Sequence, residues 1–421
     1  GETMRTLTGA DLGAMLRPGM RVFVGGSSNE PRGLVDALAA ACQDTPDAAA
    51  GVTFLQFPLP GINRFDFSTL HETARMETFF LTPDLQDSHA AGHVRFVPMH
   101  LRHVFDFLQA EPPDLAFVQV ARDGDGELRL GPNADFHAAA SGASRVIAEY
   151  NTGIVAPAGA PAVAESSLYG VVETSRPLPE MPPPRLDDTA RTIGAHVASL
   201  VHDGDCLQTG IGAIPAAILA ALGNHNDLGL HGGLLDDGGK ALIEAGVVTG
   251  ARKAVRTGEH VAGMLLGSQE LHAWAATRRD VVLAGADVTH DARVIASLDN
   301  FVSVNSAVEV DLHGQVNAEV IGSRQISGVG GAVDFMRSAR MSPGGRSIVA
   351  MTAAARRGTQ SRIVPRTAVV TALRTDVDTV VTEFGIARLH GLPAQARAEA
   401  LIAIAHPDFR GELKEAATAS T

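Results

Sequence analysis

The stretch DGDCLQTGIGAIPAAILAAL, residues 203–222, indicates the fold class of this chain. A short apolar run leads into a glycine turn, and Pro215 then stands in the first turn of a helix-forming segment, where its missing N–H is tolerated. The stretch PGMRVFVGGSSNEPRGLVDAL, residues 18–38, repeats this order, with Pro31 in the corresponding place. Apolar or small residues follow each proline on one face of the helix. Two domains of one fold would explain the match, although any strand–turn–helix unit has similar features.

Strand-like and helix-like runs alternate along the chain, as in RVFVGG (21–26), GLVDALAAAC (33–42) and GVTFLQF (51–57). This alternation predicts an α/β fold with largely parallel, buried sheets. The proline-rich stretch RPLPEMPPPRLDD (176–188) interrupts it and is typical of a stiff connector. We therefore predict two similar open α/β domains that face each other across a cleft, residues 1–182 and residues 183–421.

Charge and composition bear on the class of partner. The chain carries 47 acidic and 34 basic residues and a formal net charge of −13, which argues against a nucleic-acid or anionic membrane surface. No apolar run approaches the ~20 residues of a membrane span, and the first residues do not form a signal peptide. Cys42 and Cys206 have no metal-ligand spacing and are typical of a reducing compartment. We expect a cytoplasmic protein with no nucleic-acid or membrane partner.

The glycine turn TGIGAIP (209–215) is a first candidate anion site. The amides of Gly210 and Gly212, together with the helix that follows, would suit a phosphate, a carboxylate or an oxyanion. The turn matches neither GxGxxG nor a Walker motif, so it gives little support to a nucleotide site.

A second glycine turn lies in QISGVGGAVDF (325–335) and contains Gly328, Val329, Gly330 and Gly331. Its amides would either stabilise a developing oxyanion or simply form a tight turn. Arg346, a little further along the chain, would bind a phosphate or lie solvated on the surface.

Other catalytic signatures are missing. The 16 histidines form no HExxH motif and no cluster with cysteine, so we predict no metal site. No GxSxG elbow occurs. Glutamates in or beside apolar runs, such as Glu149, are more typical of salt-bridged carboxylates than of nucleophiles.

Several long stretches resemble the acetyl-CoA hydrolase/transferase family, a branch of the class I CoA-transferases that includes 4-hydroxybutyrate and butyrate:acetate CoA-transferases. They include LQTGIGAIPAAIL (207–219), SVNSAVEVDLHGQVNAEVIGSRQISGVGGAVDFMR (303–337) and DVDTVVTEFGIARLHG (376–391). RVFVGGSSNEPRGLVDAL (21–38) carries the resemblance into the first half. It implies two similar open α/β domains, a coenzyme A thioester as substrate with no bound cofactor, a small-molecule acceptor and a homodimer.

The resemblance also implies a mechanism. In that family a glutamate side chain attacks the acyl-CoA, and an acyl anhydride and then a glutamyl–CoA thioester follow before a second carboxylic acid collects the CoA. The family's oxyanion hole corresponds here to the turn from Gly328 to Gly331. Its glutamate normally stands in a motif like His-Ser-Glu-Met-x-Ser-Asp-Gly, which reads HGGLLDDG (231–238) in this chain. The flanking residues keep the register, so Gly233 occupies the position of the nucleophile.

Three functions remain open. An ordinary CoA-transferase would need another carboxylate, such as Asp236, to reach the thioester. Direct attack of an amine, alcohol, carbanion or water on the thioester would use the space left at Gly233, with His231 or Asp236 as general base. A protein that only binds acyl-CoA would tolerate the glycine as well. In the first half, Glu165 and Tyr169 replace the family's polar acceptor residues and are candidates for the substrate pocket.

Overall fold

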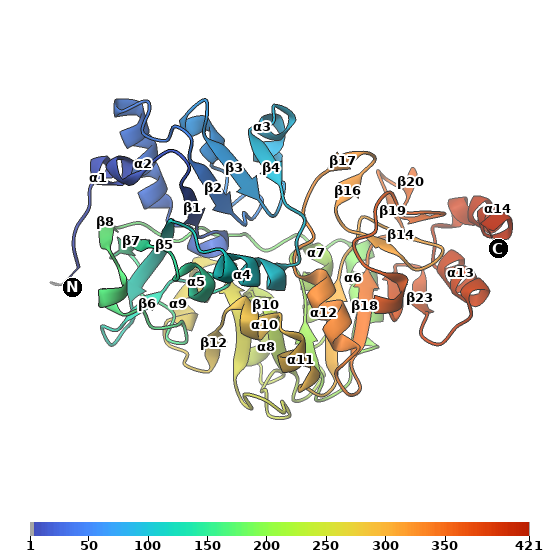
Figure 1. Cartoon of the computed structure of the whole chain (residues 1–421). Coiled ribbons are helices and arrows are strands. Elements are labelled where there is room, and N and C mark those ends of the chain that lie inside the picture. Colours follow the sequence, from blue (N-terminus) through green and yellow to red (C-terminus); the bar gives the residue numbers. More distant parts are fainter. Residues whose placement is uncertain (1–3, 421) are drawn as a thin grey trace. The chain divides into compact units, whose positions relative to one another are not determined.

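The computed structural model describes residues 4–420, and the chain forms two compact units (Figure 1). Unit 1 contains the residues up to Met181 together with Ala262–Val288, and unit 2 contains Pro182–Val261 and the residues from Thr289 onwards. The predicted boundary after residue 182 falls within one residue of the first crossing. It does not include the return of the chain to unit 1 at residues 262–288. No proline-rich or charged stretch in the sequence indicates this return.

Unit 1 is built around a sheet in which the strands run in the order β4-β3-β2-β1-β5-β7-β8, with β6 paired to β5. The strands β1 to β8 are Arg21–Val24, Thr53–Gln56, Arg75–Thr78, Val94–Phe96, Leu115–Arg122, Leu128–Leu130, Arg145–Asn151 and Gly170–Thr174. All pairs are parallel except β5 with β6. β5 is buried along almost its whole length, which explains its continuous apolar run.

The helices of unit 1 are α1 (Gly9–Met15), α2 (Arg32–Asp44), α3 (Gln86–Ala90), α4 (Leu101–Ala110) and α5 (His137–Ala140). α1 packs beside α2, and α4 packs beside α5 (Figure 1). α2 presents Leu34, Val35 and Leu38 to the core, at the spacing of one helix face. The sequence-predicted helix 33–42 is confirmed.

A buried carboxylate ties α2 to the sheet. Glu149 on β7 is fully buried, accepts hydrogen bonds from the backbone N–H groups of Gly33 (2.7 Å) and Leu34 (3.1 Å), and pairs with Arg176 Nε at 2.7 Å. A carboxylate at a helix N-terminus satisfies N–H groups that have no partner inside the helix. Glu149 is therefore a salt-bridged structural residue, as its apolar sequence context indicated.

In unit 2 the strands run in the order β10-β9-β13-β18-β22-β23. Their bounds, from β9 in chain order, are β9 Cys206–Gln208, β10 Gly229–Leu235, β13 Phe301–Asn305, β18 Arg346–Ala350, β22 Thr379–Thr382 and β23 Gly385–Arg388. Along this order, as far as the structure describes the strands, β22 pairs with β23 in the antiparallel sense and the other neighbours are parallel. Short strands build small accessory sheets: β14 Glu309–Asp311, β15 Val316–Asn317, β16 Val320–Ile321, β17 Arg324–Gln325, β19 Ala354–Ala355, β20 Gln360–Ser361 and β21 Ile363–Val364.

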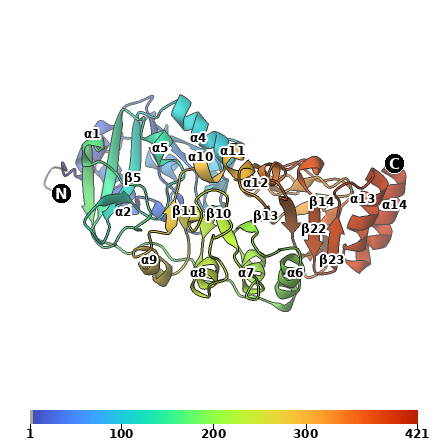
Figure 2. The same ribbon diagram turned by 90° about the horizontal axis from the view of Figure 1, so that it is seen from below.

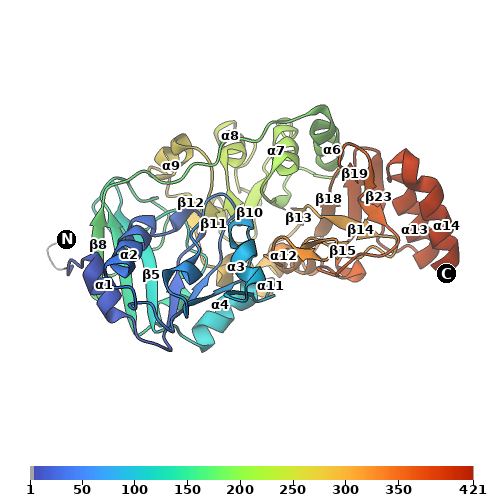
Figure 3. The same ribbon diagram turned by 90° about the horizontal axis from the view of Figure 1, so that it is seen from above.

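Helices cover both faces of this second sheet. They are α6 (Asp188–Ala198), α7 (Ala213–Ala220), α8 (Asp237–Glu244), α11 (Ala292–Ala296), α12 (Ala332–Ala339), α13 (Ala394–Ala403) and α14 (Arg410–Ser420). Figure 2 and Figure 3 show α6, α7 and α8 in a row along one face, with α11 and α12 on the other. The α/β class and the parallel sheets predicted from the sequence are confirmed.

The two stretches that begin alike occupy the same place in their sheets. β1 lies between β2 and β5, and β9 lies between β10 and β13, with parallel pairing on both sides. Each strand leads through a glycine turn into a helix, α2 or α7. The prolines differ in detail, because Pro31 is the residue before α2 whereas Pro215 is the third residue of α7.

The returning segment of unit 1 carries α9 (Gln269–Ala275) and β12 (Val281–Leu283), and it begins within β11 (His260–Leu265) and ends within α10 (Ala286–Thr289). Backbone hydrogen bonds join it to the rest of the unit, from Ala134 N to Gly263 O (2.9 Å) and from Leu283 N to Gly159 O (3.0 Å). Across residues 4–420, no helix has both the length and the apolar character needed to cross a membrane.

Candidate functional site

The first glycine turn of unit 2 follows the carboxyl end of a parallel strand. β9 ends at Gln208, two residues before Gly210. Gly232 on β10 lies beside Gln208, since a Cβ placed on Gly232 would be 3.0 Å from Gln208 Cγ. The side-chain amides of Gln208 and Asn305, the last residues of β9 and β13, donate hydrogen bonds to each other at 3.3 and 3.2 Å. The ends of three neighbouring strands thus form one edge, where ligands of open α/β sheets bind.

Two glycines in these turns adopt backbone conformations that other residues avoid. Gly212, directly before α7, has φ of 124° and ψ of −176°, a region that only glycine occupies readily. Gly330 has φ of 62°, in the left-handed region. Both turns therefore depend on glycine.

The turn from Gly328 to Gly331 leads directly into α12, and Gly331 is the residue that precedes its first turn. Within residues 4–420, the backbone N–H groups of Gly330 and Gly331 donate no hydrogen bond to another group of the chain. Together with the dipole of α12, these amides can bind the oxygen of a polarised carbonyl. The geometry is compatible with the predicted oxyanion role, which stays a prediction.

His231 and Gly233 stand two residues apart on β10 and so point to the same face of the strand. His231 is buried, and its Nε2 lies 3.1 Å from the carbonyl oxygen of Thr289. Because a carbonyl oxygen only accepts, Nε2 carries the proton in this contact. One ring nitrogen of the predicted base is therefore engaged in holding Thr289 in place.

His290, the next residue, lies against both Gly233 and Gly331. A Cβ on Gly233 would be 3.6 Å from His290 Nε2, and a Cβ on Gly331 would be only 2.5 Å from the same atom. The ring packs on Phe335 with centroids 4.3 Å apart, and its Nδ1 lies 2.6 Å from Thr289 Oγ1. The imidazole thus occupies the space in front of the position that the family resemblance assigns to the nucleophile.

Asp236 begins the next helix. Its side chain accepts a hydrogen bond from Gly239 N (2.9 Å), so it is the N-cap of α8, and burial raises the pKa of its carboxyl group. An N-cap aspartate is held by the helix N-terminus and stabilises it. This contact gives Asp236 a structural role that the sequence analysis did not consider.

Arg346 does not join the residues at this edge. It is the first residue of β18 and pairs with Val302, at the amino ends of the strands. Its guanidinium contacts Asp205 Oδ2 at 2.6 Å and the carbonyl oxygen of Leu200 at 2.7 Å. Because parallel strands place their amino ends at the edge opposite to their carboxyl ends, the predicted phosphate-binding role has no geometric support.

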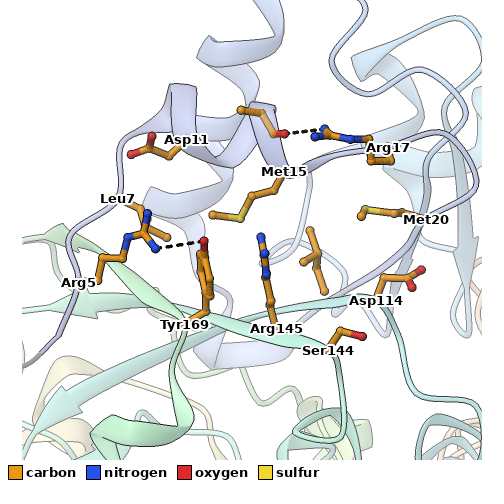
Figure 4. A pocket seen from close by; sticks show the side chains of 12 residues that line it. Arg5, Leu7, Asp11, Met15, Arg17, Met20, Asp114, Ser144, Arg145 and Tyr169 are labelled. Carbon is orange, nitrogen blue, oxygen red and sulfur yellow. Dashed lines mark hydrogen bonds between the residues drawn. The ribbon is translucent and has the colours of Figure 1, made fainter.

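Glu165 and Tyr169 belong to unit 1. Glu165 forms an ion pair with Arg122. Tyr169 lies between Arg145, 4.2 Å above its ring, and Arg5, which donates a 3.1 Å hydrogen bond to its hydroxyl group (Figure 4). Tyr169, Arg145 and Arg5 line a cavity of ≈ 500 Å³ at the amino ends of β5 and β7, and Glu165 is not among the residues that line it. Their assignment to the acceptor pocket stays a prediction.

The sequence analysis did not single out His290, Thr289 or Phe335. The segment VTHDARV (288–294) contains no glycine run and no catalytic motif. Its one clear signal is Asp291, which predicts a helix start and does cap α11. Nothing in the local pattern indicates that the histidine before this cap meets Gly233.

A parallel α/β sheet with glycine turns at helix starts is typical of the class of proteins that bind an anionic or carbonyl ligand beyond the strand ends. Models of the acetyl-CoA hydrolase/transferase N-terminal and C-terminal domains match residues 5–161 and 267–417. The chain therefore belongs to the acetyl-CoA hydrolase/transferase family, which confirms the resemblance stated from the motifs.

Individual relatives extend over nearly the whole chain. The 4-hydroxybutyrate coenzyme A transferase of Clostridium kluyveri is 37% identical over 400 residues, 93% of this chain and 92% of that protein. The crystal structure of RipA from Yersinia pestis superposes with a TM-score of 0.91 at 32% identity and covers 99% of this chain and 97% of that one. A 4-hydroxybutyrate CoA-transferase from Porphyromonas gingivalis gives 0.82 at 32% identity, with 99% and 98% covered.

Proposed function

We propose that this protein transfers the acyl group of an acyl-CoA directly to an acceptor or to water, without a covalent glutamyl intermediate. Family membership and the relative named for coenzyme A transfer support an acyl-CoA substrate. The observation that carries the proposal is the pair of Gly233 and His290. Position 233 offers no nucleophile, and an imidazole stands 3.6 Å from where its Cβ would be.

The proposed chemistry needs polarisation of the thioester carbonyl. The amides of Gly330 and Gly331 would hold the carbonyl oxygen as it gains negative charge, and such preorganised donors often provide the largest single part of acyl-transfer catalysis. The acceptor then attacks the carbonyl carbon and the CoA thiolate leaves. Asp236 is poorly suited to act as a replacement nucleophile, because its carboxylate is held at the start of α8.

A trapping experiment tests the proposal. The protein is incubated with acetyl-CoA, and its mass is measured before and after treatment with hydroxylamine, which releases CoA from a glutamyl thioester. Because no carboxylate relay is expected, we expect no CoA bound covalently to the protein. A hydroxylamine-sensitive CoA adduct would instead support an ordinary CoA-transferase, and tight binding of CoA without turnover of any thioester would support a protein that only binds.

Restoring the nucleophile gives a complementary test. We expect Gly233→Glu to form the covalent CoA adduct and to exchange CoA between carboxylates, while its direct acyl transfer falls. Gly233→Ala is the matched control, because its Cβ meets His290 at an ordinary van der Waals distance and adds no carboxylate. Identical behaviour of the glutamate and alanine variants in both assays would contradict this assignment of the site.

A further inference from the structure

The cavity of ≈ 500 Å³ in unit 1 lies at the amino ends of the strands (Figure 4). Its lining comes from α1 and from the starts of β5 and β7, and all of it belongs to unit 1. Ligands of open α/β sheets normally bind beyond the carboxyl ends of the strands, so this cavity is not at the usual place. Pockets of roughly 300 to 1,000 Å³ are large enough to bury most of a small organic molecule.

Three arginine side chains line this cavity, Arg5, Arg17 and Arg145. Tyr169 lies between two of them: the guanidinium of Arg145 is 4.2 Å from the centroid of its ring, and Arg5 Nη1 donates a 3.1 Å hydrogen bond to its hydroxyl group (Figure 4). A guanidinium that stacks on an aromatic ring keeps the N–H groups at its edge available for an anion. Tyr169 therefore holds two cationic groups in place without neutralising either of them.

The third arginine is held by the backbone. Arg17 Nη1 donates to the carbonyl oxygens of Ala14 and Leu16, at 2.6 and 2.8 Å, where α1 ends. Its Nη2 and Nε groups take no part in these bonds. As far as residues 4–420 are concerned, none of the three guanidinium groups forms a salt bridge with a carboxylate.

Two carboxylates also line the cavity, and both already accept hydrogen bonds from the backbone. Asp11 Oδ2 accepts from Thr8 N at 2.8 Å in the capping box of α1, and Asp114 Oδ2 accepts from Arg21 N at 2.8 Å. With three arginines and two aspartates, the lining carries a formal charge of +1, in a chain whose net charge is −13. A ligand with one negative charge would balance this local excess.

Apolar side chains form much of the remaining lining. Leu7 and Leu115 are buried, and Met15 and Met20 are partly buried against the core of unit 1. Methionine side chains are flexible and adapt to ligands of irregular shape. A ligand that combines one anionic group with a short aliphatic chain would therefore use both the arginines and the apolar part of the cavity.

We propose that this cavity binds an aliphatic carboxylate, at a site additional to the acyl-CoA site of the proposed function. The carboxylate accepts hydrogen bonds from Arg145 and from a second arginine, because the paired N–H groups of a guanidinium match the two oxygens of a carboxylate. The aliphatic chain packs on Met15 and Met20. The ligand binds here and does not react, so Tyr169 serves a site other than the acceptor pocket expected from the sequence.

The test is isothermal titration of the full chain with butyrate and with hexanoate. We expect hexanoate to bind roughly 15-fold more tightly, because each of its two additional CH₂ groups raises the affinity about fourfold when buried. Arg145→Ala should weaken hexanoate binding roughly tenfold or more, since a hydrogen bond between two charged groups is lost, and should leave the KM for acetyl-CoA unchanged. Arg145→Lys should lie between, because it keeps the charge and lacks the paired donors. Arg95→Ala is the matched control, since Arg95 is exposed on the edge strand β4 and does not line the cavity.

Several outcomes would overturn the inference. Hexanoate that binds Arg145→Ala as tightly as the wild type, or does not bind the wild type at all, would show that the cavity is not its site. Inorganic phosphate that binds as tightly as hexanoate, with no effect of chain length, would overturn the carboxylate class. A raised KM for acetyl-CoA in Arg145→Ala would make the cavity part of the acyl-CoA site. The proposed function fails separately, through a covalent CoA adduct, which leaves the carboxylate site unaffected.

Discussion

The imidazole of His290 lies directly against the backbone of Gly331, and its Nε2 is 2.5 Å from where a Cβ on that glycine would be. Real Cβ atoms do not approach another atom so closely, so one of the two groups would have to move. The absence of a side chain at position 331 is therefore a condition for the position of the ring. The same ring lies in front of Gly233, so two glycines and one histidine form a single structural unit.

Gly331→Ala should displace this ring. The backbone of Gly331 has φ of −102°, which alanine adopts without strain, so the effect arises from the contact with His290 alone. We expect acyl transfer from acetyl-CoA to fall by about a hundredfold, because a displacement near 1 Å at a reacting site can have that effect. Gly233→Ala, whose Cβ has room, should fall far less. Equal losses in the two variants would show that the close contact between position 331 and the ring is not the cause.

Asp236 can be tested as a cap and as a base by two substitutions. Asp236→Asn keeps an oxygen that accepts from Gly239 N and should retain both stability and activity, whereas Asp236→Ala should lose about 1 kcal/mol of unfolding free energy. Urea unfolding measures the stability of both variants, and CoA release measures their activity, so together they separate the capping role from a role as base. Loss of activity in a stable Asp236→Asn variant would restore the aspartate as a candidate base.

Arg346 should matter for stability and not for substrate binding. Removing its side chain leaves Asp205, whose side chain is 3% exposed, without this ion pair, and such losses are typically about 3 kcal/mol. We expect Arg346→Ala to unfold at lower urea concentration with an unchanged KM for acetyl-CoA, and Arg346→Lys to lie between it and the wild type. A raised KM at unchanged stability would return the arginine to the ligand site.

Glu30 should make unit 1 less stable as the pH rises. It is 5% exposed, accepts a 2.6 Å hydrogen bond from Gln56 Nε2, and burial raises its pKa from 4.5 to about 7. The folded state therefore binds more protons than the unfolded state between these values. The stabilisation is fully present below pH 4.5 and is lost as the pH rises through about 7, a change of about 3 kcal/mol.

Glu30→Gln should remove this part of the pH dependence, because glutamine does not ionise. Urea unfolding of both proteins between pH 4.5 and 8 measures the difference. Glu111→Gln, at an exposed position, is the control and should leave the wild-type profile unchanged. A wild-type profile retained in Glu30→Gln would mean that another group causes it.

The fold was largely predictable because its signals are local. The order of apolar run, glycine turn and helix at residues 203–222 is sufficient to predict β9 and α7, and the buried run at residues 115–120 predicts β5. The assignment of Gly233 to the nucleophile position depends on residues on both sides that keep the register of a longer motif, and it stays a prediction. These predictions use only residues that are close together in the sequence, so no knowledge of the tertiary structure is needed.

The rest of the candidate site depends on contacts between distant segments. His290 meets Gly233 and Gly331 only after β10, the start of α11 and the start of α12 have packed together, and the residues around it carry no motif. Arg346 follows a glycine pair in the sequence, and for this residue we predict either a phosphate-binding role or a solvated position on the surface. Its position at the amino end of β18 became clear only from the direction of the strands. Asp236 was predicted as a candidate base, and the structure shows in addition that its side chain caps α8.

The return of residues 262–288 to unit 1 has a consequence for anyone who divides this protein. A fragment that ends at Met181 would lack β12 and the residues that bond to Gly159 and Ala134. The complementary fragment would carry that segment without Ala134 and Gly159, to which its backbone is hydrogen-bonded in the intact chain. We therefore expect neither fragment to fold as well as it does in the intact chain. The chain passes between the two units at residues 181/182, 261/262 and 288/289. Truncation, permutation or tagging of this enzyme scaffold should therefore take account of all three positions.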